Sequence, residues 1–110
     1  MRFGLKEKVI QQIQDVFAAF PEVDEAVLYG SWAKGNYRTG SDIDFTLKGG
    51  NMSLSVLNKI SSQLDDLLLP YKFDLSIYRS IDNPALVDHI NRVGVSFYRA
   101  EDVNGGVERK

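Results

Sequence analysis

Two aspartates flank a single isoleucine at Asp42-Ile43-Asp44, and Phe45-Thr46-Leu47 continues the alternation of polar and apolar residues. Side chains alternate across a β-strand, so the pattern predicts a strand over residues 42–47. Both carboxylates then share one face, and Ile43 points into the core. Two carboxylates side by side repel each other unless a cation lies between them, and Mg²⁺ is the usual cation where carboxylates meet phosphate. The stretch therefore constrains the fold and the chemistry together.

A glycine and a serine follow the apolar run Ala26 to Tyr29, which predicts a short strand over residues 25–29. Glycine lets phosphate oxygens approach the backbone, and amides at the start of a following helix favour anions. The serine hydroxyl can donate to a terminal phosphate, and a lysine one turn further on can neutralise phosphate charge. The predicted nucleotide-binding residues are Gly30, Ser31, Lys34 and Ser41, with Arg38 as a weaker candidate.

The rest of the chain alternates between helical and strand patterns. Apolar residues at helical spacing predict helices over residues 5–20 and 53–69, the second capped by Asn51 or Ser53. A helical turn is expected over 32–36, and a last helix begins at Asp82 or Asn83 and ends at Gly94. Strict alternation predicts a third strand over 71–78, and 95–99 forms a fourth strand at the edge.

The order strand, helix, strand over residues 42–78 favours a parallel pair with a right-handed crossover. The expected fold is therefore an α/β (α+β) domain, with a small mixed sheet of three to four strands and helices packed against it. Asp74 lies on the polar face of the third strand. If that strand lies beside the second, its carboxylate joins Asp42 and Asp44.

Three carboxylates can hold two metal ions roughly 3.5 to 4 Å apart, an arrangement that suits in-line displacement at phosphorus. The predicted catalytic and metal-binding residues are Asp42, Asp44 and Asp74. Asp74 could also accept the proton of an attacking hydroxyl. His89 is the only histidine and shares a helical stripe with apolar residues, so we interpret it as a packing residue.

Length and composition narrow the classes of protein further. A chain of 110 residues is expected to form one domain, with residues from about 102 to 110 as a mobile tail. The absence of cysteine excludes disulfides and cysteine-based zinc sites and makes the cytoplasm the expected location. No apolar run is long enough for a membrane span. A net charge of -2 argues against broad nucleic-acid binding.

Gly30-Ser31, ten residues, Asp42-Ile43-Asp44 and a later strand aspartate together resemble the minimal nucleotidyltransferases of the polymerase-β-like superfamily. The resemblance implies a nucleotidyltransferase fold, ATP as donor, one or two Mg²⁺ ions and release of pyrophosphate. It assigns triphosphate binding to Gly30 and Ser31, metal binding to the Asp42–Asp44 pair, and the third carboxylate to Asp74. Lys34-Gly35 also matches a basic-glycine pair of the family. Trp32 departs from the pattern, because many relatives carry arginine there.

Many such minimal proteins resemble antitoxins that act beside a small helical HEPN-type ribonuclease toxin. The resemblance implies Mg²⁺-dependent transfer of AMP from ATP to a hydroxyl of that protein partner, and a homo-oligomer is also compatible with it. Two alternatives stay open. The chain could be a non-catalytic binding module that neutralises its partner by occlusion, or it could transfer a nucleotide to a small molecule. Relatives of the last kind usually carry an extra helical domain.

Overall fold

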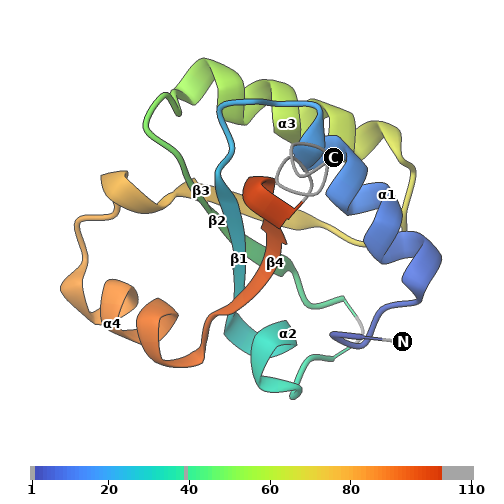
Figure 1. Ribbon diagram of the computed structural model, residues 1–110. Coiled ribbons are helices and arrows are strands. Elements are labelled where there is room, and N and C mark those ends of the chain that lie inside the picture. The colour runs from blue at the N-terminus through green and yellow to red at the C-terminus, as the bar shows by residue number, and fades with distance from the viewer. Residues whose placement is uncertain (1, 39, 103–110) are drawn as a thin grey trace.

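A four-stranded mixed sheet forms the centre of the protein, shown in Figure 1 as a computed structural model that describes residues 2–38 and 40–102. The strands lie in the order β3 (Phe73–Ile77), β2 (Ile43–Lys48), β1 (Glu25–Tyr29) and β4 (Val95–Arg99). β1 is antiparallel to both neighbours, whereas β2 and β3 are parallel. The predicted mixed sheet, its parallel pair and its edge strand are confirmed. β2 begins at Ile43, so Asp42 lies just before the strand.

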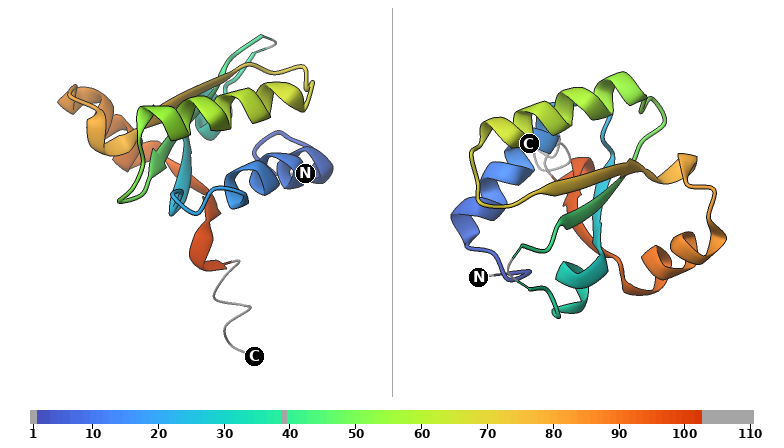
Figure 2. Two further views of the ribbon diagram at one scale, coloured as in Figure 1. Left: turned by 90° about the horizontal axis from the view of Figure 1, so that it is seen from above. Right: turned by 180° about the vertical axis from the view of Figure 1, so that it is seen from behind.

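The helices cover the two faces of the sheet unequally, as the views in Figures 1 and 2 show. α1 (Glu7–Ala18) and α3 (Leu54–Asp66) pack on one face, where the main core includes the fully buried Phe17, Phe45 and Ile60. α4 (Pro84–Val93) packs over β1 on the other face. The short helix α2 (Gly30–Lys34) continues directly from β1, and a 3₁₀ turn (Tyr78–Ser80) follows β3.

Side-chain caps begin two of the helices at positions that the sequence predicts. The Ser53 hydroxyl accepts a hydrogen bond from the Val56 amide at 3.2 Å, and the Asn83 side chain accepts one from the Ala85 amide at 2.9 Å. Gly94 ends α4. These caps satisfy amides that have no partner within the helix, so they fix where each helix starts.

Two helices are shorter than predicted. α1 spans Glu7–Ala18 instead of residues 5–20, and α3 ends at Asp66 instead of Leu69. Leu68 has a φ of 56°, so the chain has already left the helix before Pro70 could terminate it. A left-handed residue just past a helix end lets the chain reverse direction, and the apolar spacing cannot reveal this.

A smaller apolar cluster occupies the opposite face of the sheet and consists of Val27, Tyr29 and Ile90. The His89 ring lies edge-on to the Tyr29 ring, with centroids 6.3 Å apart, and is half-buried. His89 is therefore a packing residue, as predicted. This cluster lies over β1, and the two aspartates of β2 and β3 on the same face are not fully covered: Asp44 is half-buried and Asp74 is exposed.

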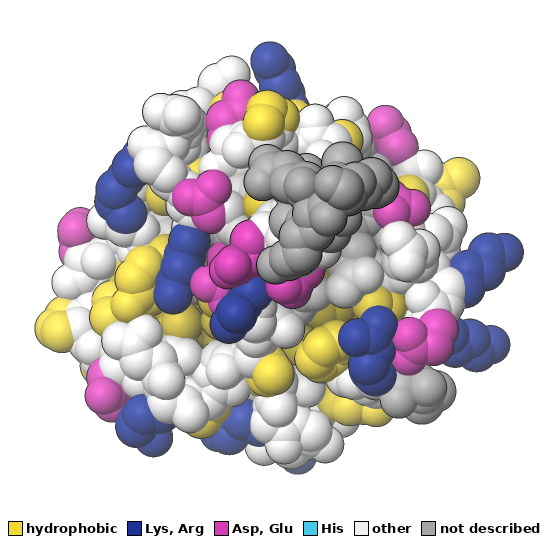
Figure 3. All heavy atoms as spheres, in the orientation of Figure 1, with side chains coloured by type: hydrophobic (Ala, Val, Ile, Leu, Met, Phe, Trp, Pro, Cys, Tyr) yellow, Lys and Arg dark blue, Asp and Glu magenta, His cyan; other side chains and the backbone are white. Residues whose placement is uncertain are grey.

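The surface carries a mixture of charges. On the face in Figure 3, basic and acidic side chains are interspersed with apolar ones instead of forming a continuous basic area. Within residues 2–38 and 40–102, no helix is long and apolar enough to cross a membrane. The predicted mobile tail lies outside the described residues, except Asp102, which is in a helical turn.

Candidate active site

A row of three side chains crosses the sheet at one end. Tyr29 on β1 is the antiparallel partner of Asp44 on β2, and Asp44 is in turn the parallel partner of Asp74 on β3. Directly paired residues point to the same face of a sheet, so the two carboxylates lie side by side. The sequence predicts this meeting of residues thirty positions apart. It does not predict that Tyr29 completes the row.

The Asp44 carboxyl group lies in an environment that disfavours its charge. Burial, and next the negative charges of Asp74 and Asp42, raise its pKa from 3.8 to about 6. Burial also raises the pKa of the Tyr29 phenol, with further contributions from Asp44 and Asp74 and an opposing hydrogen bond with Ser76. Asp44 is therefore close enough to interact with both of the other predicted carboxylates, Asp42 and Asp74. A cation at this place would relieve their repulsion.

Gly30 allows the close approach of Asp44 to the backbone. Its φ of 75° is unfavourable for other residues, and an added Cβ atom would collide with Oδ2 of Asp44. Ser31 follows in the first turn of α2 and is half-buried, and Lys34 lies exposed in its last turn. Gly35, with a φ of 81°, ends this helix. The predicted triphosphate-binding residues therefore continue directly from the strand that pairs with Asp44.

The loop between α2 and β2 is held by Trp32. The Trp32 ring stacks on Tyr37 with centroids 3.9 Å apart, and its Nε1 donates to the Ser41 carbonyl at 3.3 Å. The Ser41 hydroxyl accepts from the Arg38 amide at 2.9 Å and closes a turn. Trp32 thus packs locally, at the position where many relatives carry arginine. A contact of Ser41 with nucleotide stays a prediction.

The aspartates of the candidate site are suitable ligands for Mg²⁺, but they do not complete its coordination without a substrate. Among the described residues, no group of three or more aspartate, glutamate or histidine side chains is arranged to hold a metal ion. Asp44 and Asp74 nevertheless offer adjacent carboxylate oxygens, the ligand type that Mg²⁺ prefers, and the ion takes its other ligands from phosphate and water. The assignment of Asp42, Asp44 and Asp74 as three metal ligands stays a prediction.

A cavity of about 640 Å³ opens beside the candidate site. It extends from the loop before β2 to the segment before β3 and contains two of the predicted residues, Ser41 and Asp42. Its other lining residues are Gly4, Trp32, Tyr37, Arg38, Gly40, Pro70, Tyr71 and Lys72. Sequence reasoning missed Tyr71 and Lys72, although they directly precede the strand that carries Asp74.

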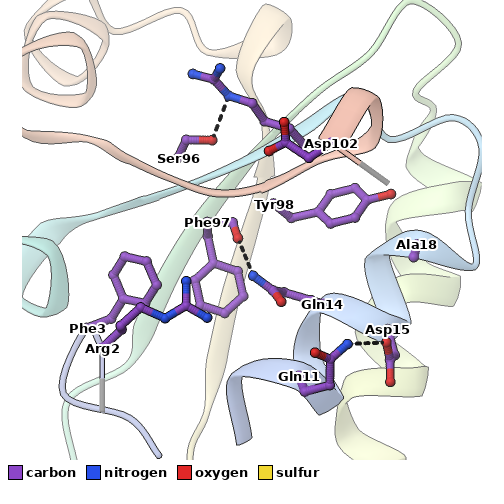
Figure 4. A pocket seen from close by; sticks show the side chains of 11 residues that line it. Arg2, Phe3, Gln11, Gln14, Asp15, Ala18, Ser96, Phe97, Tyr98 and Asp102 are labelled. Atoms are coloured by element: carbon purple, nitrogen blue, oxygen red, sulfur yellow. Dashed lines mark hydrogen bonds between the residues drawn. The ribbon is translucent and has the colours of Figure 1, made fainter. Parts of the chain in front are cut away.

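A second cavity, of about 360 Å³, lies between α1 and β4 and is shown in Figure 4. Its lining includes no predicted site residue. Gln14 points toward the edge strand there and donates to the Phe97 carbonyl at 2.8 Å. This bond satisfies a backbone acceptor that the outer strand would otherwise expose, so Gln14 has a structural role at the edge.

The sequence profile of the family described as "Polymerase beta, Nucleotidyltransferase" matches residues 11–102, which include every predicted site residue. No curated protein sequence matches the chain.

Several solved structures share the fold. A toxin-antitoxin structure with AMP-PNP has 20% sequence identity and a TM-score of 0.67, covering 92% of this chain and 79% of that one. The toxin-antitoxin MntA-HepT structure has 16% identity and a TM-score of 0.64, covering 91% and 78%. A tri-AMPylated HEPN toxin from Shewanella oneidensis in complex with MNT antitoxin has 18% identity and a TM-score of 0.56, covering 89% and 72%.

Proposed function

Because the chain belongs to the polymerase beta nucleotidyltransferase family, we propose that it transfers AMP from ATP to a hydroxyl group of a partner protein. The observation that carries the proposal is the register of the sheet, which puts the Asp44 and Asp74 carboxylates side by side, next to Gly30-Ser31. A carboxylate pair beside a glycine-serine turn suits a nucleoside triphosphate with its metal.

In the reaction, the acceptor oxygen forms a bond to the α-phosphorus of ATP, and the bond from that phosphorus to the bridging oxygen of the β-phosphate breaks. Pyrophosphate leaves with the electron pair of the broken bond. The proton of the acceptor hydroxyl passes to Asp74, which is exposed and can release it to water. Gly30 and Ser31 hold the terminal phosphates, and Lys34 offsets their charge.

Magnesium, when bound, would be held by Asp44 and Asp74 with Asp42 beside them, and would neutralise charge on the reacting phosphates. Asp44 is suited to binding a cation, because burial and two neighbouring carboxylates disfavour its negative charge and a bound cation would offset that effect. Two of the similar solved structures support ATP chemistry in proteins of this fold: one contains AMP-PNP, and another contains an AMPylated HEPN toxin.

For the partner we propose a small helical HEPN-type toxin, with the present chain as its antitoxin. The fold is shared with MNT antitoxins that were solved in complex with HEPN toxin. The exposed position of Asp42 and Asp74 fits an acceptor that arrives from outside the chain. A cytoplasmic location, where ATP and Mg²⁺ are available, is part of the proposal.

The test combines the purified protein, ATP, Mg²⁺ and the protein encoded by the neighbouring reading frame, and follows the partner by intact mass. We expect a mass increase of one or more adenylyl groups on the partner. The double variant Asp42→Asn with Asp44→Asn should fold normally and leave the mass of the partner unchanged.

Transfer that continues in the double variant would contradict the carboxylate mechanism. A double variant that transfers nothing but still neutralises the partner would favour occlusion over AMP transfer as the mode of neutralisation.

A further inference from the structure

Three hydroxyl groups are connected by hydrogen bonds on the face of the sheet that carries the two aspartates. Ser76 on β3 is the parallel partner of Thr46 on β2, and its Oγ donates to Thr46 Oγ1 at 2.9 Å. This pair follows the Asp44–Asp74 pair, two residues further along both strands. The Tyr29 phenol forms a hydrogen bond with Ser76. We call Tyr29, Ser76 and Thr46 the hydroxyl chain.

We propose that Tyr29 is a positioning residue of the nucleotide site, and that its hydroxyl oxygen accepts a hydrogen bond from a water molecule of the cation held by Asp44 and Asp74. The inference rests on the proposed function, in which that cation accompanies ATP. It deepens the proposed function by assigning a role to a residue outside the carboxylates and the glycine-serine turn.

The side chain of Tyr29 is held by its surroundings. β2 lies between β1 and β3 in the sheet (Figure 1), so this side chain extends over β2 to reach Ser76. Thr46 on that face of β2 is completely buried, in agreement with a ring that covers it. The ring also packs with Ile90 and lies edge-on to His89. Because Tyr29 is only 8% exposed, little rearrangement is needed when a ligand binds.

The proton of the Tyr29 hydroxyl is directed away from the carboxylates. Within the described residues, burial and charge affect the pKa of Asp44 but no hydrogen bond does, so Tyr29 does not donate to that group. Ser76 donates its own proton to Thr46, which leaves the Ser76 oxygen as the acceptor for Tyr29. The Tyr29 oxygen therefore keeps acceptor capacity, and it lies close enough to Asp44 and Asp74 for their charges to raise its pKa.

An acceptor oxygen beside two carboxylates requires a donor that the carboxylates also attract. Ionised aspartates cannot donate, and a phosphate oxygen is itself an acceptor. Mg²⁺ retains several of its water molecules in protein sites, and each of them can donate. The Tyr29 oxygen thus suits a water molecule of the cation. Groups that orient a metal ion through its ligands commonly contribute tenfold or more to affinity or activity.

Nucleotide binding without any acceptor protein tests the inference apart from catalysis. The probe is α,β-methylene ATP, which cannot transfer its adenylyl group, and calorimetric titration measures its affinity in Mg²⁺ and in EDTA. We expect Tyr29→Phe to weaken binding in Mg²⁺ by about threefold to tenfold, as for loss of one hydrogen bond, and to have no effect in EDTA. The matched control Tyr98→Phe removes the hydroxyl of another buried tyrosine, on β4, and should leave both affinities unchanged.

Ser76 separates the direction of the hydrogen bond from the packing of the ring. Ser76→Ala removes the acceptor of the Tyr29 proton, which can then turn to a carboxylate and compete with the cation. We expect Ser76→Ala to weaken binding in Mg²⁺ by at least about threefold, but to add nothing in the Tyr29→Phe background. Ser76→Thr keeps the hydroxyl group and should bind like the wild type.

Unchanged affinity of Tyr29→Phe in Mg²⁺ would overturn the inference. Equal weakening in EDTA, by Tyr98→Phe, or by Ser76→Ala in both backgrounds would also overturn it, because the effect would then not pass from Tyr29 to the cation. Failure of the proposed function gives a different result: the expected binding pattern without AMP transfer would retain the role of Tyr29 and contradict the enzyme activity. A wild-type protein that binds no nucleotide in Mg²⁺ would contradict both.

Discussion

The carboxyl group of Asp44 is half-buried and interacts with those of Asp74 and Asp42, and both burial and repulsion raise its pKa. A nucleotide with its metal would gain from these charges, whereas the free protein is destabilised by them. Active sites commonly show this conflict between function and stability. At the residue scale, substitution of Asp44 measures this conflict between binding and stability.

We expect Asp44→Asn to abolish AMP transfer and to raise the free energy of unfolding by about 1 kcal/mol at pH 8, after discounting the pKa shift for partial exposure. The folded state holds the Asp44 proton more tightly than the unfolded state. Wild-type protein should therefore lose stability relative to the variant as the pH rises from 3.8 to about 6, and the difference should then stay constant. Denaturant unfolding across this pH range measures the difference in the free energy of unfolding between wild type and variant. The substitution Asp66→Asn, at an exposed position, is the control. If the wild-type protein instead became more stable relative to the variant as the pH rises over this range, the raised pKa of Asp44 would be contradicted.

Gly30 begins α2 and Gly35 follows its last residue. Comparing substitutions of the two glycines separates the contact of Gly30 with Asp44 from backbone strain. Gly30 and Gly35 both have positive φ angles, but only Gly30 has a carboxylate where a Cβ atom would lie. Both Gly→Ala variants should lose about 1 to 2 kcal/mol of stability through backbone strain. Gly30→Ala should lose more, together with transfer activity, because Asp44 must move. Equal stability and equal activity in the two variants would show that the contact is unimportant.

At the scale of elements, strands could be predicted more closely than helix ends. Alternation predicts a strand over residues 71–78, and β3 spans Phe73–Ile77 within that range. The face of Asp74 follows from the same local alternation. The end of α3 is different: Leu64, Leu67 and Leu68 keep helical spacing, yet the helix ends at Asp66. Leu68 is 88% exposed, so its apolar side chain belongs to no core stripe. Only tertiary packing distinguishes such a leucine from a buried one.

Leu68 offers a test of this helix end. A leucine at a φ of 56° costs free energy that asparagine largely avoids, and the exposed side chain has little burial to lose. Leu68→Asn should therefore stabilise the protein by about 0.5 to 1 kcal/mol, measured as a higher denaturant midpoint at unchanged slope. Leu54→Asn is the matched control, because Leu54 is 66% exposed but lacks the positive φ. If both substitutions stabilised the protein, the cause would be the replacement of an exposed apolar side chain by a polar one, and not the relief of backbone strain at residue 68.

On the scale of the whole molecule, the candidate site depends on the order of strands in the sheet. The parallel β2–β3 pair, which the strand–helix–strand pattern predicts, brings Asp74 to Asp44. The cavity of about 640 Å³ could not be predicted, because its lining joins the N-terminal turn at Gly4, the loop at Tyr37 and the segment at Tyr71. Those contacts arise only when the helices have packed on the sheet, and no local pattern encodes them.

The proposed donor site leaves Asp42 and Asp74 exposed, so we expect turnover to depend on the acceptor. Water can reach the site, but no described element closes over the two carboxylates to orient it, whereas a docked hydroxyl gains a high effective concentration. We expect the protein alone to bind ATP with Mg²⁺ and to release pyrophosphate slowly. The acceptor protein should increase that rate at least about tenfold. A coupled pyrophosphate assay measures both rates, and the double variant Asp42→Asn with Asp44→Asn is the control. Pyrophosphate release at the full rate without acceptor would mean that water is the substrate, and the requirement for a partner would then be wrong.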